Sequence, residues 1–243
     1  MTSMRALVVA HDHVSPIGPI GDQLERRGYE LEHFLVVPED HFETPAVTTT
    51  LPDFTSYDAV VVLGAVWSVY DDASIGTWIH DEVKQVQAAD AAGVPVLGIC
   101  FGGQVLAQAH GGSVERAQRP EIGWTDVASV DEGVVASGPW FQWHFDRWVT
   151  PPEARLVASN AVGPQAFVLR RNLAVQFHPE LTPSSLAGWL ENGGEAGART
   201  AGFDPERLVE ETDLLAERNR ARAAALVDAF LDQVAAVDLS ADL

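Results

Sequence analysis

The residue best suited to chemistry is Cys100, the single cysteine among 243 residues. It stands in the run Gly98-Ile-Cys-Phe-Gly-Gly-Gln104, after an apolar run that begins at Val94 and before a helix-compatible run that ends at His110. Glycines there permit a backbone that other residues resist, so the pattern predicts a tight strand-to-helix turn with the thiol at its apex. The positive end of a helix dipole favours a thiolate, which is a nucleophile. A small buried cysteine at a strand end is the equally open alternative.

A cysteine nucleophile needs a base, and the base needs a group that orients it. His178 follows the apolar run 174–177 and precedes Pro179 and Glu180. A carboxylate two residues from a strand-end histidine can hold the imidazole tautomer and stabilise its protonated form. His144, in the run Phe-Gln-Trp-His-Phe-Asp of residues 141–146, is the competing candidate.

Histidines 11 and 13 flank Asp12 at the end of the first apolar run, which raises the question of a metal site. Two histidines and one aspartate without a third spaced ligand are weak evidence for a metal. We therefore expect no metal and no cofactor.

Strands and helices alternate over the first hundred residues, and these elements must position the candidate side chains. Strand patterns cover 4–10, 30–37, 58–64 and 94–99, and helix patterns cover 19–27 and 73–92. This order predicts an α/β fold with a doubly wound, mostly parallel sheet and flanking helices. Active sites of such sheets lie at the carboxyl ends of strands, where Gly64 and Cys100 both stand.

The pattern of apolar and polar residues changes after Gly112, where short strand-like segments follow one another without long helices between them. They cover 123–130, 140–144, 154–159, 165–170 and 173–177, and they predict an antiparallel extension. A short helix over 182–191, a flexible break over 193–197 and a helix capped by Asp204, with Pro205 in its first turn, complete the chain. We expect a catalytic domain over 1–192, and over 193–243 a flexible break and a C-terminal helical extension packed on it.

Composition narrows the functional classes. A formal net charge of −20 argues against nucleic-acid binding through phosphate neutralisation. No apolar run approaches the ~20 residues of a membrane span, and the N-terminus shows no separate signal segment. One cysteine excludes an internal disulfide and fits a reducing compartment, so we expect a cytoplasmic protein. The oligomeric state stays open.

The two motifs around Cys100 and His178, in this order and spacing, resemble the class I glutamine amidotransferase family over residues 4 to 190. Three shorter runs resemble the stand-alone, GMP-synthase-like members, which carry no attached synthetase: Ser68-Val-Tyr-Asp-Asp72, Glu121-Ile-Gly-Trp124 and Phe141-Gln-Trp-His144. The resemblance implies a flavodoxin-like topology and a substrate that is glutamine or another γ-glutamyl amide.

The resemblance also implies the site residues. Cys100, His178 and Glu180 would form a catalytic triad that cleaves the amide through a γ-glutamyl thioester. An oxyanion hole would come from backbone N–H groups of Phe101 and of a second donor at or beside Gly64 and Ala65. The amino-acid end of the substrate would be held by Gln104 and the backbone of Trp143, His144 and Phe145.

Two segments depart from the family pattern. The loop after the third strand usually reads Gly-Gly-Pro, and here it reads Gly64-Ala65-Val66 before Trp67. If residue 65 needs a positive φ, alanine is strained there by roughly 1 kcal/mol. Gly103 stands where a larger residue is commoner. We therefore take Gly103, Val66 and Trp67 as candidates for substrate specificity.

Three functions remain under consideration. The first is glutamine hydrolysis with ammonia supplied to a separate synthetase. The second is a free-standing hydrolase of γ-glutamyl peptides or γ-glutamyl amines. The third, from another class, is a catalytically silent partner-binding subunit, and retention of all three triad positions argues against it.

Overall fold

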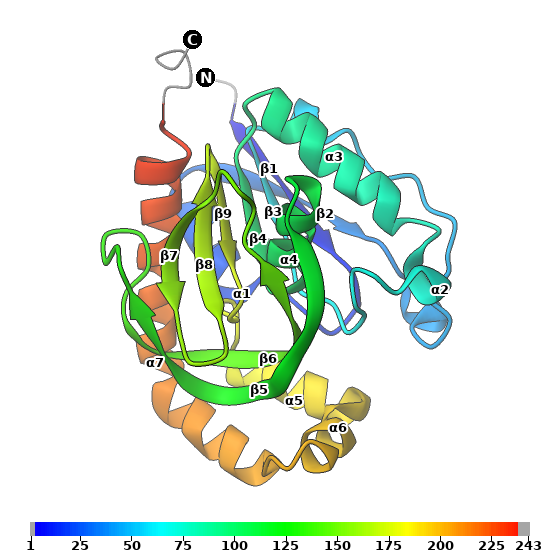
Figure 1. The fold of residues 1–243 in the computed structure, drawn as a ribbon, viewed down its shortest axis with the longest axis vertical. Coiled ribbons are helices and arrows are strands. Elements are labelled where there is room, and N and C mark those ends of the chain that lie inside the picture. The colour runs from blue at the N-terminus through cyan, green and yellow to red at the C-terminus, as the bar shows by residue number, and fades with distance from the viewer. Residues whose placement is uncertain (1–2, 238–243) are drawn as a thin grey trace.

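The computed structural model describes residues 3–237, which fold around one nine-stranded sheet. Its strand order is β2-β1-β3-β4-β9-β8-β7-β5-β6 (Figure 1). Parallel pairing joins β2 (Tyr29–Leu35), β1 (Met4–Ala10), β3 (Ala59–Val62), β4 (Val96–Ile99) and β9 (Asn172–Val175). Antiparallel pairing continues through β8 (Pro164–Leu169), β7 (Arg155–Ser159), β5 (Ser113–Ser129) and β6 (Gly138–Val149). The predicted α/β fold with an antiparallel extension is confirmed, and the sheet is mixed.

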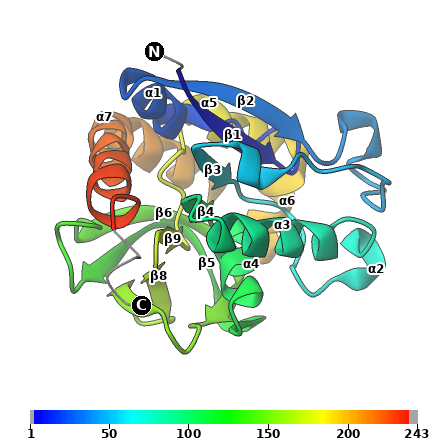
Figure 2. The same ribbon diagram turned by 90° about the horizontal axis from the view of Figure 1, so that it is seen from above.

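Helices cover both faces of the parallel half (Figure 2). On one face lie α1 (Gly18–Arg26) and α7 (Pro205–Ala229), and on the other α3 (Ile79–Ala91) and α4 (Phe101–Ala109). Successive strand residues alternate between the two cores: Val8 and Val61 pack toward α1 and α7, whereas Val9 and Val62 pack toward α3 and α4. Because both faces are buried, these strands appear in the sequence as continuous apolar runs.

The single helix expected over 73–92 is divided into α2 (Asp72–Ile75) and α3. The division lies at Trp78, whose side chain is 1% exposed and whose indole N–H donates to the backbone oxygen of Pro45 (2.9 Å). A continuous helix is therefore replaced by a bend that buries this indole. The helical periodicity was correct, but it did not reveal the bend.

The C-terminal segment is helical almost throughout. A short π-helical stretch (Leu190–Gly194) links α5 (Pro183–Trp189) to α6 (Glu195–Thr200), and the backbone bends at Asn192 and at Gly193, whose φ is 96°. The expected break over 193–197 is thus a kink followed by a helix. Asp204 caps α7 as predicted, accepting from the backbone N–H of Glu206. The last six residues of the predicted extension lie outside the described part.

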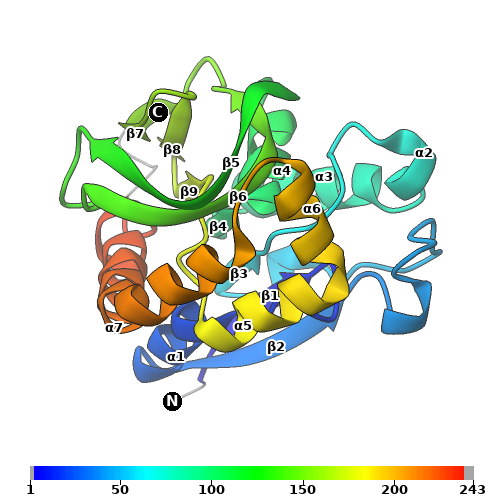
Figure 3. The same ribbon diagram turned by 90° about the horizontal axis from the view of Figure 1, so that it is seen from below.

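The end of α7 and the π-helical stretch Phe230–Val234 that follows it are part of the main core. Leu226, Phe230 and Val234 are buried in the same cluster as Val8 and Val61 of the sheet. The long β5–β6 ribbon curves past the carboxyl ends of the parallel strands, with α5 and α6 nearby (Figure 3). None of the helices within residues 3–237 is long and apolar enough to cross a membrane.

Candidate active site

Cys100 stands at the turn between β4 and α4, with φ 50° and ψ −104°. A non-glycine residue in this region is strained, at a cost of about 1–3 kcal/mol. The neighbouring glycines have a different role from the expected one, because the unusual backbone belongs to the cysteine itself. A Cβ on Gly102 would overlap the carbonyl oxygen of Val62, and one on Gly98 would lie 2.5 Å from the carbonyl oxygen of Gly102. Gly102 lets the turn pack directly against β3, and Gly98 lets the end of β4 pack against the first turn of α4.

The thiol of Cys100 is 5% exposed and has two polar neighbours. Its Sγ lies 3.9 Å from the backbone oxygen of Trp143 and accepts from the Nε2 amide of Gln176 (3.5 Å). Gln176 is fully buried, and its Oε1 accepts from Nε2 of Gln104 (3.4 Å). Gln176 belongs to the recognised histidine motif, yet the sequence assigned it no contact with the nucleophile.

His178 and Glu180 form a buried pair beside the thiol. Nδ1 of His178 lies 2.7 Å from Oε1 of Glu180, and the two side chains are 6% and 1% exposed. Nε2 of His178 is buried without a hydrogen-bond partner in the described residues. A Cβ placed on Gly64 would lie 3.2 Å from Cε1 of His178 and 3.9 Å from Cβ of Cys100. Gly64, His178 and Cys100 therefore lie next to one another.

The charge state of His178 follows from these neighbours. Burial lowers the pKa of His178, but the charge of Glu180 and that of Cys100 outweigh it and hold the pKa well above its usual value. The pair therefore favours an imidazolium next to the sulfur, as a thiolate–imidazolium nucleophile requires.

His144, the competing candidate base, is engaged elsewhere. Its Nδ1–H donates to the backbone oxygen of Asp146 (2.9 Å), and its Nε2 lies 3.2 Å from Glu121. Glu121 is buried and also accepts from Gln165 (2.9 Å), so it supports the floor beneath His144. This geometry leaves His178 as the histidine that faces the thiol.

The predicted oxyanion residues lie at the same place. Phe101 is the first residue of α4, where the backbone N–H has no acceptor within the helix. Gly64 and Ala65 line the cavity beside Cys100. Among non-glycine residues in the described range only Cys100 and Arg170 have positive φ, so Ala65 does not carry the strain considered from the sequence.

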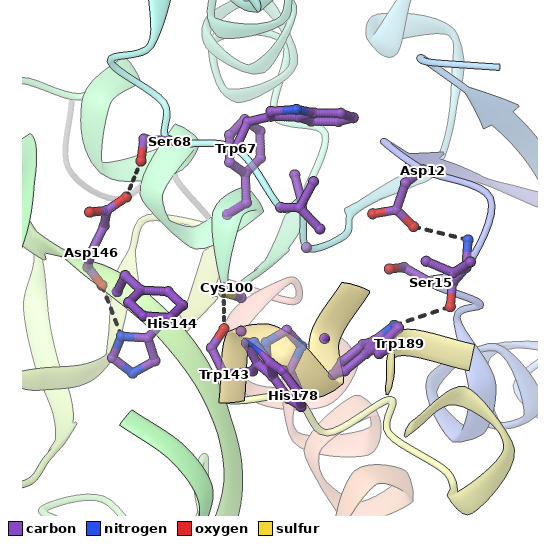
Figure 4. A pocket seen from close by; sticks show the side chains of 18 of the residues that line it. Asp12, Ser15, Trp67, Ser68, Cys100, Trp143, His144, Asp146, His178 and Trp189 are labelled. Atoms are coloured by element: carbon purple, nitrogen blue, oxygen red, sulfur yellow. Dashed lines mark hydrogen bonds between the residues drawn. The ribbon is translucent and has the colours of Figure 1, made fainter. Parts of the chain in front are cut away.

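A cavity of about 360 Å³ opens over the thiol (Figure 4). Asp146 and His144 lie on one side of Cys100, and Asp12, Ser15 and Trp189 lie on the other. The predicted residues Gln104, Trp143, Phe145, Val66 and Trp67 also line it. Gln104 is 3% exposed and its Nε2 lies 3.4 Å from the backbone oxygen of Asp146.

Part of the wall comes from the end of the helix predicted over 182–191 and from the flexible break predicted over 193–197. Trp189, Asn192, Gly193, Gly194 and Gly197 line the cavity. The indole of Trp189 packs edge-on against the ring of His178 at 4.9 Å, and its N–H donates to the backbone oxygen of Val14 (3.1 Å). No sequence signal placed this segment against His178.

Gly103, predicted as a candidate for substrate specificity, is not among the residues that line the cavity. A Cβ at this position would lie 3.0 Å from Cζ3 of Trp148 and 3.0 Å from the backbone oxygen of Val175. The residue faces the interior between α4 and the sheet. Its small size leaves room for the indole of Trp148, which is 1% exposed.

Helix α7 holds the loop that carries Glu180. The side-chain amide of Asn219 donates to the backbone oxygens of Pro179 (3.1 Å) and Leu181 (3.0 Å), the residues on either side of Glu180. Asn219 is 2% exposed. The C-terminal extension therefore holds the loop that carries Glu180, besides covering the core.

The two histidines considered for a metal have separate partners. His11 lies 3.0 Å from Glu82, whereas His13 packs edge-on against Phe42 and lies 3.9 Å from Glu39. The structure does not combine them with Asp12 into one ligand set.

Comparisons with known proteins identify the family of the chain. The family described as "Glutamine amidotransferase class-I" matches residues 20–194. The chain is 33% identical to a subunit of the glutamine-hydrolysing GMP synthase of Sulfolobus acidocaldarius, over 63% of this chain and 86% of that protein. It is 39% identical to the glutamine-hydrolysing GMP synthase of Thermus thermophilus over 63% of this chain, but spans only 31% of that longer protein.

Solved structures share the fold at low identity. A glutamine amidotransferase from Thermotoga maritima superposes with a TM-score of 0.81 at 22% identity, covering 96% of this chain and all of that one. One from Methylobacillus flagellatus gives a TM-score of 0.82 at 21% identity and covers 96% of each chain. With the family match over most of the chain, the protein is an enzyme that belongs to the class I glutamine amidotransferase family.

Proposed function

We propose that the protein hydrolyses the side-chain amide of glutamine with Cys100 as nucleophile, His178 as proton carrier and Glu180 as the residue that orients it. The observation that carries this proposal is the buried 2.7 Å contact between His178 and Glu180 beside the only thiol. A carboxylate that favours the charged form of the histidine beside the thiol is what a cysteine nucleophile needs.

The chemistry follows from the arrangement. Sγ of Cys100 forms a bond to the amide carbon, and the carbonyl oxygen becomes an oxyanion that the N–H groups of Phe101 and Ala65 stabilise. His178 gives a proton to the departing nitrogen, so the C–N bond breaks and ammonia leaves. Water then attacks the γ-glutamyl thioester with His178 as base, and glutamate and the free thiol result.

The role of the ammonia is inferred from the relatives. The Sulfolobus protein, of which this chain covers 86%, is named as one subunit of a glutamine-hydrolysing GMP synthase. We propose that the ammonia formed here is likewise passed to a separate synthetase, with glutamine as the substrate.

One observation favours a second candidate, a free-standing hydrolase of γ-glutamyl amines or peptides. The aromatic side chains of Trp67, Phe42 and Trp189 line the cavity together with Cys100. Apolar aromatic walls suit a leaving group larger than ammonia, because they bury carbon rather than solvate a small polar product.

The experiment measures glutamate release from glutamine and from a series of γ-glutamyl alkylamides and dipeptides. We expect turnover of glutamine by the wild type and none by Cys100→Ala, with an unchanged circular dichroism spectrum. Normal activity in Cys100→Ala refutes the mechanism. A preference for glutamine that rises on adding a synthetase lacking its own amidotransferase domain refutes the second candidate, whereas a strong preference for an alkylamide refutes ammonia transfer.

A further inference from the structure

A second histidine–carboxylate pair lies beneath the loop that carries the proposed oxyanion donor. His11, at the end of β1, and Glu82, on α3, are both 0% exposed. Nε2 of His11 lies 3.0 and 3.1 Å from the two carboxylate oxygens of Glu82. Removing two charged groups from water costs several kcal/mol per ion, so desolvation of a fully buried pair of this kind opposes folding.

The other nitrogen of His11 reaches the loop itself. Nδ1 lies 3.0 Å from the backbone oxygen of Gly64. A carbonyl oxygen only accepts, so Nδ1 carries the proton and donates it. The charge and hydrogen bonds of Glu82 outweigh the effect of burial and raise the pKa of His11, which favours an imidazolium that donates from both nitrogens.

The carbonyl of Gly64 and the N–H of Ala65 belong to one planar peptide unit. The described residues contain no cis peptide bond, so this N–H points opposite to the carbonyl. His11 contacts this carbonyl, and Gly64 itself lies beside Cys100 and His178. Fixing the oxygen therefore also fixes the direction of the N–H, and a positive charge at the oxygen increases the polarity of the whole unit.

The ring of His11 also touches the residue that supplies the first donor. It packs edge-on against the ring of Phe101 at 4.7 Å and stacks on Trp78 at 5.6 Å. The bend at Trp78 that divides α2 from α3 thus completes the packing around His11. His11 therefore contacts Phe101 directly and reaches the peptide unit of Ala65 through the carbonyl oxygen of Gly64.

We propose that His11, held by Glu82, is a positioning residue that orients and polarises the Gly64–Ala65 peptide as part of the oxyanion hole. The inference rests on the proposed function, since it concerns the same amide cleavage. The loop gives a reason for such support: residues 64–67 contain no proline, and Val66 is 63% exposed. Because His11 contacts its carbonyl oxygen, the peptide keeps its direction although Val66 directly after it faces solvent.

The test compares three variants with the wild type. His11→Phe combined with Glu82→Leu keeps an aromatic ring against Trp78 and leaves no unpaired buried charge. Glu82→Gln keeps the shape and lets a neutral His11 still donate to Gly64, so it isolates the charge. His110→Phe is the matched control, because His110 pairs with buried Asp90 (3.2 Å) at the opposite end of α4.

Two rates are measured for each variant: steady-state hydrolysis of the best γ-glutamyl substrate, and alkylation of Cys100 by iodoacetamide, followed by intact mass. Alkylation is a displacement that forms no oxyanion, so it reports on the nucleophile alone. The chain has no other thiol to confuse the readout.

We expect the double variant to lose about ten- to a hundredfold in kcat, less than the roughly hundredfold or greater loss typical of removing a donor outright. KM should stay within about threefold and alkylation within about twofold, since neither depends on an oxyanion. Glu82→Gln should lose about threefold or more in kcat, and His110→Phe should keep kcat while its melting temperature falls.

A double variant with wild-type kcat overturns the inference. So does a parallel fall of kcat and alkylation, because the pair would then support the cysteine turn instead. If the double variant does not fold, a wild-type kcat in Glu82→Gln overturns the polarising role. If the wild type turns over a γ-glutamyl amide, these outcomes test the inference alone. If the wild type turns over no γ-glutamyl amide, both the proposed function and the inference are overturned.

Discussion

Glu180→Gln tests the triad most directly, because it removes one charge and keeps the size of the side chain. The substitution breaks a 2.7 Å hydrogen bond between groups that are both nearly inaccessible to water. A hydrogen bond to a charged group is worth about 1.5–3 kcal/mol, which corresponds to roughly ten- to a hundredfold in rate. A glutamine amide can also donate to Nδ1 of His178 and select the wrong tautomer, a change that costs about 10⁴ in serine-protease triads.

The expected loss in kcat therefore lies between about 10 and 10⁴. KM should change little, since Glu180 does not line the cavity. The assay is steady-state glutamate release, with the concentration of active thiol determined by alkylation. A loss smaller than about tenfold would refute the reasoning that Glu180 orients and charges His178.

The same variant makes a prediction about stability and pH. Glu180 raises the pKa of His178 in the folded protein, so the pair stabilises the fold fully below the unfolded histidine value of about 6.5. This contribution is lost as the pH rises through the higher folded pKa. The difference in unfolding free energy between wild type and Glu180→Gln, from urea titrations, should thus be larger at pH 6 than at pH 9. A difference that grows with pH contradicts the assigned direction.

Three further substitutions test the contacts of Gly103, Asn219 and Gln176. Gly103→Ala should lower the unfolding free energy by about 1–3 kcal/mol through overpacking against Trp148, and KM should stay within about twofold of wild type. A changed KM at unchanged stability would instead indicate that Gly103 contacts the substrate. Asn219→Leu should cost about 1–3 kcal/mol for each buried carbonyl it leaves without a donor and should lower kcat, and unchanged urea unfolding contradicts this. Gln176→Leu should slow alkylation of Cys100 severalfold, because it removes one hydrogen bond worth about 0.5–1.5 kcal/mol. An unchanged rate would show that the contact between Gln176 and the sulfur does not affect the reactivity of the thiol.

The local features of the site could be predicted from the sequence. The apolar run before Cys100 and the glycine-rich run after it specify a strand-to-helix turn, because periodicity and backbone sterics act over a few residues. The short spacing from His178 to Glu180 likewise allows contact without help from distant elements. The alternation of strands and helices was enough to predict the α/β fold, and the order of the two motifs was enough to identify the family.

The remaining features depended on contacts across long stretches of chain, which spacing does not encode. His11 meets Glu82 over 71 residues, and only the packing of β1 against α3 brings them together beneath Gly64. The direction that Gly103 faces was decided by the rotation of α4 on the sheet, which turns it toward Trp148. The sequence by itself determined which groups we propose for the chemistry. The tertiary structure decided which groups hold them, because burial and hydrogen bonding of polar side chains are settled only when separate elements close around them.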